Sequence, residues 1–91
     1  MQTTYFKNIQ FSRLVKTEGR LREFNFTRHN DNNGTVVFSV DVCDNRSNRV
    51  MFSMRMEDNS WKIVQQELPS WIMLYEKNFH ELIEGELSKA S

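Results

Sequence analysis

Apolar and polar residues alternate over two long stretches of the chain, and this period of two constrains the fold more than any other feature. The alternating apolar residues are Val36, Phe38, Val40 and Val42 in the first stretch and Val50, Phe52, Met54 and Met56 in the second. Side chains of a β-strand point alternately to opposite faces of the sheet, so the pattern indicates strands with one buried face. Shorter stretches around Phe24 and Trp61 follow the same pattern.

Three clusters rich in Asn, Asp and Ser separate these stretches, at residues 30–34, 44–48 and 57–60. Asn and Asp tolerate a left-handed backbone and hydrogen-bond to their own chain, which makes such clusters turns. Short turns join sequential strands into antiparallel hairpins. We therefore predict strands at about 20–28, 35–43, 49–57 and 61–66. Residues 1–16 stay unassigned, because Ile9 and Phe11 alternate without a turn to isolate them, so this segment either extends the first strand or covers a sheet edge.

The apolar period changes after Pro69, which suits the first position of a helix. Apolar residues then recur every three or four positions, as expected for an amphipathic helix, at Ile72, Tyr75, Phe79, Leu82 and Ile83. We predict a helix over about 69–88, with a start near Tyr75 as the alternative because residues 71–74 are apolar all round.

The predicted fold class is α+β: a four-stranded antiparallel β-meander followed by one C-terminal α-helix that packs on one sheet face. The chain of 91 residues fits a single domain, 1–91. The residues expected between sheet and helix are Phe24, Phe26, Phe38, Val40, Phe52, Met54, Trp61 and Ile63.

The opposite sheet face is predicted to be mostly polar, with Val37, Met51 and Val64 as a small apolar centre. This face is either solvated or a contact surface for a second copy or a ligand. In the second case these three residues are the predicted interface.

Charge is balanced over the chain but divided between its two parts. Residues 1–56 carry a net charge of +4 and residues 57–91 a net charge of −4. A basic sheet and an acidic helix are therefore expected, and the helix acids Glu76, Glu81, Glu84 and Glu86 form either a solvated face or a partner for a basic surface. The lone cysteine Cys43 and the lack of an apolar leader favour a cytoplasmic protein without a membrane span.

Metal binding and catalysis have little support in the sequence. Cys43, His29 and His80 fall on a strand, a turn and a helix, without the spacing of metal ligands. Asp41 and Asp44 are more typical of turn chemistry than of a pair of catalytic carboxylates. We therefore expect no metal, no cofactor and no enzymatic activity.

Basic residues with aromatic neighbours on the strands provide the main functional hypothesis. Arginine beside aromatic rings can bind the phosphates of single-stranded nucleic acid and stack on its bases. In the alternative interpretation, the phenylalanines face the core and the arginines only keep the sheet soluble. The predicted nucleic-acid contacts are Arg22, Arg28, Asn45, Arg46, Arg49 and Arg55, and Arg20 has the same character.

The stretch from Phe38 to Phe52 resembles the PUR repeat, a single-stranded nucleic-acid-binding unit. The matching positions are Phe38, Val40, Asp41, Val42, Asn45 and Arg49, and Phe79 and Leu82 are similar to the end of the family's helix. Two positions depart from the family pattern: Asn48 replaces a turn glycine and is expected to adopt a left-handed backbone, and Cys43 replaces a basic residue.

The resemblance implies four antiparallel strands and one helix per repeat. It also implies a homodimer, since PUR domains pair two repeats. The leading expectation is thus a non-enzymatic homodimer that binds single-stranded DNA or RNA. The alternative is a protein–protein interaction module that uses the outer sheet face and the acidic helix.

Overall fold

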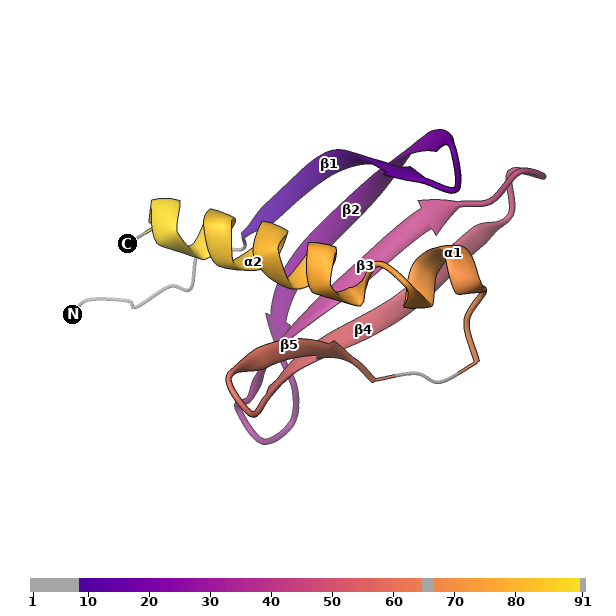
Figure 1. Cartoon of the computed structure of the whole chain (residues 1–91). Coiled ribbons are helices and arrows are strands. Elements are labelled where there is room, and N and C mark those ends of the chain that lie inside the picture. Colours follow the sequence, from indigo (N-terminus) through magenta and orange to yellow (C-terminus); the bar gives the residue numbers. More distant parts are fainter. Residues whose placement is uncertain (1–8, 65–66, 91) are drawn as a thin grey trace.

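The computed structural model describes residues 9–64 and 67–90. Five strands are followed by a short helix and a long one (Figure 1). The elements are β1 (Gln10–Thr17), β2 (Arg20–Asn30), β3 (Val36–Cys43), β4 (Arg49–Glu57), β5 (Ser60–Ile63), α1 (Ser70–Met73) and α2 (Glu76–Ala90).

The strands form one sheet in the order β1-β2-β3-β4-β5, and each strand is antiparallel to its neighbours. The α+β class and the antiparallel meander are therefore confirmed, whereas the prediction of four strands is wrong. The additional strand is β1, which overlaps the segment 1–16 that the sequence pattern does not assign; residues 1–8 of this segment lie outside the described residues. Strand β1 pairs with β2 over eight consecutive residues because Glu18 and Gly19, with φ of 51° and 80°, form a tight turn between them.

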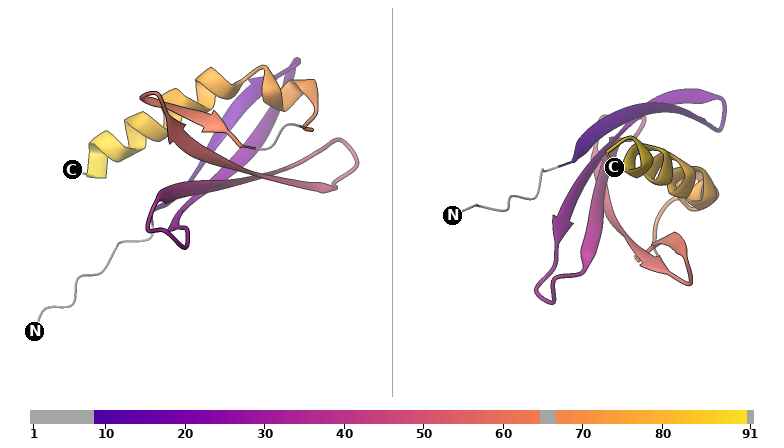
Figure 2. Two further views of the ribbon diagram at one scale, coloured as in Figure 1. Left: turned by 90° about the horizontal axis from the view of Figure 1, so that it is seen from below. Right: turned by 90° about the vertical axis from the view of Figure 1, so that its left-hand side faces the viewer.

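The sheet curves into a half-barrel, and α2 lies along its concave side (Figure 2). All eight residues predicted to lie between sheet and helix are buried in one core cluster, together with Phe11, Val42, Ile72, Phe79 and Ile83. The ring of Phe79 lies within 6.2 Å, centroid to centroid, of the rings of Phe24, Phe26 and Phe52. This aromatic cluster fixes the helix on the sheet.

The single predicted helix is two helices, and it is interrupted at Leu74 and Tyr75. The backbone N–H of Tyr75 donates to the carbonyl of Ile72, three residues back, so the α-helical bonding pattern is broken there. Ile72 and Phe79 are both fully buried. The interruption allows α1 to close one end of the half-barrel while α2 runs along its concave side.

Candidate nucleic-acid interface

The six predicted nucleic-acid contacts do not form one surface. Arg22 and Arg28 lie on the concave side of β2, on the same side as Phe24, but toward opposite ends of the strand. Asn45 and Arg46 lie in the β3–β4 loop, at the end of the sheet near Arg22. Arg49 and Arg55 lie on the convex face, because their partners across the sheet are Cys43 and Val37.

Arg22 is the most buried of these residues, with 9% of its surface exposed. The centre of its guanidinium group is 4.0 Å from the centroid of the Trp71 ring in α1. Its Nε donates a hydrogen bond of 2.8 Å to Oγ1 of Thr17, which is fully buried. Strand β1 and helix α1 therefore hold the guanidinium in one orientation.

Arg20 links two hairpins at this end of the sheet. Its Nη1 donates a hydrogen bond of 2.7 Å to Oδ1 of Asn45. On the other side of the same hairpin, the backbone N–H of Glu18 donates to the hydroxyl oxygen of Tyr75. The β1–β2 turn is thus tied both to the β3–β4 loop and to the junction of the two helices.

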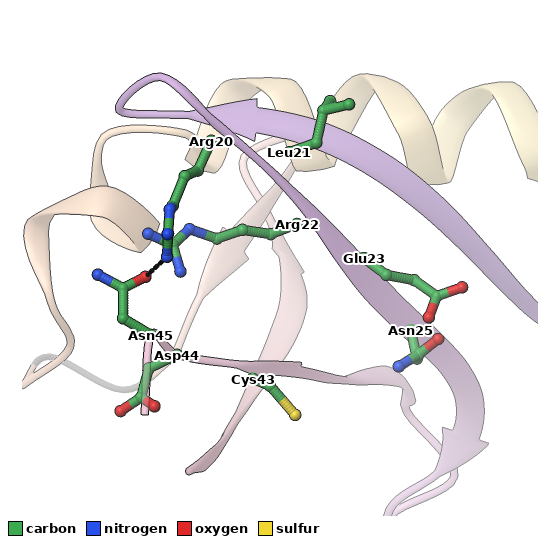
Figure 3. Close-up of a pocket in the computed structure, with 8 residues that line it drawn as sticks. All are labelled: Arg20, Leu21, Arg22, Glu23, Asn25, Cys43, Asp44 and Asn45. Atoms are coloured by element: carbon green, nitrogen blue, oxygen red, sulfur yellow. Dashed lines mark hydrogen bonds between the residues drawn. The ribbon is translucent and has the colours of Figure 1, made fainter. Parts of the chain in front are cut away.

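Arg20, Arg22 and Asn45 line a hollow of about 520 Å³, which we call the guanidinium hollow. Its lining residues are Arg20, Leu21, Arg22, Glu23, Asn25, Cys43, Asp44 and Asn45. Figure 3 shows the guanidinium groups of Arg20 and Arg22 together beside Asn45, with Glu23 and Asn25 at the other side of the hollow. One side of the hollow thus carries two guanidinium groups, and the lining also includes the carboxylates of Glu23 and Asp44.

No carboxylate in the described part of the chain lies within ion-pair distance of Arg20 or Arg22. No buried side-chain nitrogen or oxygen among the described residues lacks a partner. Since the one hydrogen bond of the Arg22 guanidinium is made by Nε, its terminal nitrogens reach solvent in the hollow. They are available to an anion.

Asp44 also lines the hollow, but its carboxylate is used by its own loop. Oδ1 accepts the backbone N–H groups of Asn48 and Arg46, at 2.8 Å each. The hydrogen bond from Asn48 is the main reason that the pKa of Asp44 lies below its ordinary value. The carboxylate stays ionised and shapes the loop that positions Asn45.

The remaining predicted contacts are distributed elsewhere. Arg49 pairs with Asp41 at 3.4 Å, within a row on the convex face in which Ser12 bonds Asn25 and Asn25 bonds Asp41. Arg55 lies 3.9 Å from a carboxylate oxygen of Asp31. Arg46 is exposed in the loop, and Arg28 is half-buried near the end of β2 opposite the hollow.

The three residues predicted as an interface do not form one apolar centre. Met51 and Val64 are 58% and 44% exposed, but Val37 is buried. The register places the Ser39–Ser53 pair between the Val37–Arg55 pair and the Asp41–Met51 pair. Polar side chains therefore separate Val37 from Met51.

The helix acids are largely bound within the chain. Glu76 and Glu84 accept hydrogen bonds from the backbone N–H of Ile63 and from Nε1 of Trp61. Glu86 pairs with Arg13 at 2.5 Å. These three acids are thus not a free acidic surface.

Trp71 and Thr17, which hold the Arg22 guanidinium, were not predicted from the sequence. One signal was available: Arg20 and Arg22 alternate in phase with Phe24 and Phe26, so the strand pattern places charged side chains on the buried face. A buried arginine requires partners, and here these are a hydroxyl and an indole ring.

Comparisons with protein-family models, curated proteins and solved structures gave no match to this chain. Among the described residues, no group of three or more His, Cys, Asp or Glu side chains could hold a metal ion. No helix in the described ranges is long and apolar enough to cross a membrane.

Proposed function

We propose that this chain binds single-stranded nucleic acid at the guanidinium hollow. The observation that carries the proposal is the pair of guanidinium groups from Arg20 and Arg22, which face a solvent-accessible hollow without a carboxylate partner among the described residues. Two cations held in this way bind a phosphate group well, because the ordering of Arg22 is already achieved by Thr17 and Trp71.

The neighbouring groups suit a nucleotide better than a free phosphate. The side-chain oxygen of Asn45 accepts the hydrogen bond from Arg20, so its amide N–H groups can donate to a base or to a second phosphate. The half-buried Trp71 ring, which stacks on the Arg22 guanidinium, offers an aromatic platform beside the cations for an unstacked base. A base in a duplex is paired and cannot reach such a platform, which favours single strands.

The resemblance to the PUR repeat supports the same proposal. Asn45, one of the residues that carries the resemblance, lines the hollow. Arg49, which also carries it, lies on the convex face and is paired with Asp41. We therefore assign the primary contact to Arg20, Arg22 and Asn45, and give Arg46 a supporting role as an exposed cation on the same loop.

Fluorescence anisotropy with labelled single-stranded DNA and RNA oligomers tests this proposal. Each phosphate contact contributes about −0.7 to the slope of log K against log salt for single strands, so two or three contacts predict a slope between about −1.4 and −2.1. A duplex of the same sequence should bind more weakly. No binding at low salt, or equal affinity for the duplex, would contradict the proposal.

A second candidate function is a protein-interaction module that uses the convex face. Met51 supports it, because this large apolar side chain is 58% exposed beside the polar row that ends at Asp41. The substitution Met51→Glu should then abolish association with the partner while the circular dichroism spectrum is retained. If association persists, the interface does not include this part of the convex face.

A further inference from the structure

The two edges of the sheet differ in how their backbone groups are satisfied. At the β5 edge, the outward N–H of Ile63 donates to Oε2 of Glu76 at 2.7 Å, and that of Trp61 donates to Nδ1 of His80 at 3.0 Å. Glu84 accepts the indole N–H of Trp61 at 2.9 Å. These acceptors are four residues apart, so one stripe of α2 covers the β5 edge.

The β1 edge has no such cover within the described residues. The hydrogen bond from the N–H of Arg28 to the carbonyl of Ile9 sets the phase of the β1–β2 ladder. In this phase Gln10, Ser12, Leu14 and Lys16 direct their backbone groups away from β2. The one side-chain contact to them in the described part of the chain is from Nη1 of Arg13 to the carbonyl of Ser12.

The edge also lacks most of the usual features that prevent strand pairing. The eight residue pairs of β1 with β2 are continuous, without a bulge, and β1 contains no proline. Arg13 is held by Glu86 on the concave side, which leaves Lys16 as the remaining charged side chain of the strand. An uncovered, regular edge of this length is a template for another strand.

Two exposed leucines lie beside this edge on the convex face. Leu14 and Leu21 are each 66% exposed. The register pairs Leu14 with Glu23 and Lys16 with Leu21, so the two leucines are diagonal neighbours on β1 and β2. No described residue of the chain covers them.

We propose that a second copy of this chain pairs with β1, antiparallel, about a two-fold axis at Leu14. In this register the outward backbone groups of Leu14 bond those of Leu14 in the second copy, and Ser12 pairs with Lys16. The pairs Leu14–Leu21 of both copies then form one stripe of four leucines across the joined sheet. The edge is thus complementary to itself in backbone bonding and in apolar surface.

The charge of Arg13 favours the register with the two-fold axis at Leu14 over the neighbouring register with the axis at Arg13. With the axis at Arg13, two guanidinium groups would lie directly opposite each other, and like charges in such pairs are unfavourable. With the axis at Leu14, Arg13 lies opposite Val15 of the second copy. A different protein could pair with β1 in this way only if it had an uncovered strand edge with an apolar residue opposite Leu14.

Sedimentation velocity of the full chain without nucleic acid, together with amide hydrogen exchange, tests this dimer. The wild type should sediment as a dimer, and the amides of Ser12, Leu14 and Lys16 should exchange slowly and lose this protection on dilution. Leu14→Lys should sediment as a monomer with these amides unprotected. The matched control is Leu74→Lys, which makes the same change at a 71% exposed leucine after α1 and should remain a dimer.

A monomeric wild type at all concentrations would overturn the proposal. So would a dimer that persists in Leu14→Lys, or one in which the three amides exchange freely. If Met51→Lys dissociates the dimer instead, the convex face is the interface. Leu21 belongs both to the leucine stripe and to the lining of the hollow, but the substituted residues Leu14, Met51 and Leu74 do not line it. Failure of the dimer can therefore be distinguished from failure of nucleic-acid binding.

Discussion

The two long hairpin loops have the same local construction at opposite ends of the sheet. In Asp31–Thr35, Oδ1 of the aspartate accepts the N–H groups of the third and fifth loop residues, and in Asp44–Asn48 it does the same. In both loops the first and fifth residues are also joined by a backbone hydrogen bond, and the fourth residue, Gly34 or Ser47, has a positive φ. An aspartate at the first position and a left-handed residue at the fourth thus build this turn twice.

The surroundings of the two loops are different. Asn45 of the second loop is bound by Arg20 and lines the hollow together with Arg22, whose guanidinium stacks on Trp71. Three separate segments therefore contribute to this end of the sheet. The first loop has one long ion pair, 3.9 Å between Asp31 and Arg55. The local sequence therefore determines the conformation of each loop. The guanidinium hollow forms at only one of them, because β2, the β3–β4 loop and α1 meet at that end of the sheet.

The largest effect on nucleic-acid affinity is expected from removing the stacked guanidinium of Arg22, because this group distinguishes the end of the sheet near Asp44 from the end near Asp31. Arg22→Ala should weaken binding of a single-stranded oligonucleotide by roughly tenfold or more, since hydrogen bonds to charged groups are worth about 1.5–3 kcal/mol. Arg28→Ala removes the same charge from the same side of β2 at the other end.

The Arg28 variant is the matched control in an anisotropy titration, and its affinity should stay close to that of the wild type. Arg22→Lys should recover part of the lost affinity, because it restores the charge but not the planar stack. If Arg22→Ala and Arg28→Ala lose the same affinity for the oligonucleotide, binding is not specific to the end of the sheet near Asp44.

The fourth loop position allows an intermediate effect to be measured in both loops. Gly34→Ala should lower the free energy of unfolding by about 1 kcal/mol, because a left-handed backbone is unfavourable for a residue with a Cβ atom. There is no atom within 4 Å of that Cβ, so steric contact adds nothing. Ser47→Gly should change stability in the opposite direction and by less, because glycine also raises the entropy of the unfolded chain. Urea denaturation measures the free energy of unfolding of both variants. If Gly34→Ala is as stable as the wild type, residue 34 does not have the left-handed backbone described here.

The smallest effect concerns acid stability. The pKa of Asp31 is lowered mainly by the hydrogen bond from the N–H of Thr35, and the pKa of Asp44 mainly by that from Asn48. A carboxylate whose folded pKa lies below the unfolded value of about 3.9 stabilises the fold above that pH. This contribution is lost as the pH falls through the folded value.

Asp31→Asn and Asp44→Asn should therefore each flatten the fall of stability below about pH 4, because the amide oxygen can still accept the loop N–H groups but cannot titrate. Thermal unfolding as a function of pH provides the measurement. If thermal stability falls as steeply with acid in both variants as in the wild type, other carboxyl groups cause the fall.

The alternating pattern was sufficient to predict β2, β3 and β4 and most of the core. The last strand, predicted at 61–66, ends at Ile63, and residues 65–66 lie outside the described residues. Phe38, Met54 and Trp61 lie where their parity places them, since one buried face is a property of each strand alone. Strand β1 was not identified, because its concave side carries Arg13, Val15 and Thr17 instead of a run of apolar residues. Its turn, Glu18–Gly19, contains neither Asn nor Asp.

The site could be predicted only in part. Asn45 and Arg22 were expected to be contacts and both line the hollow. Strand parity places Arg49 and Arg55 on the convex face, and Arg28 lies toward the opposite end of β2. The left-handed loop residue is Ser47 and not Asn48, because the fourth position of the loop carries the positive φ. Trp71 could not have been assigned to Arg22, because their contact depends on where the interrupted helix folds back.

Titration of the isotope-labelled chain with a short single-stranded oligonucleotide, followed by amide chemical shifts, tests the central claim most directly. We predict shifts at residues 20–22, at 44–47 and at Trp71, including its indole N–H. The matching loop at residues 31–35 should stay unchanged. Shifts centred on residues 31–35 or on the convex face around Met51, or no shifts at low salt, would contradict the claim that the guanidinium hollow binds nucleic acid.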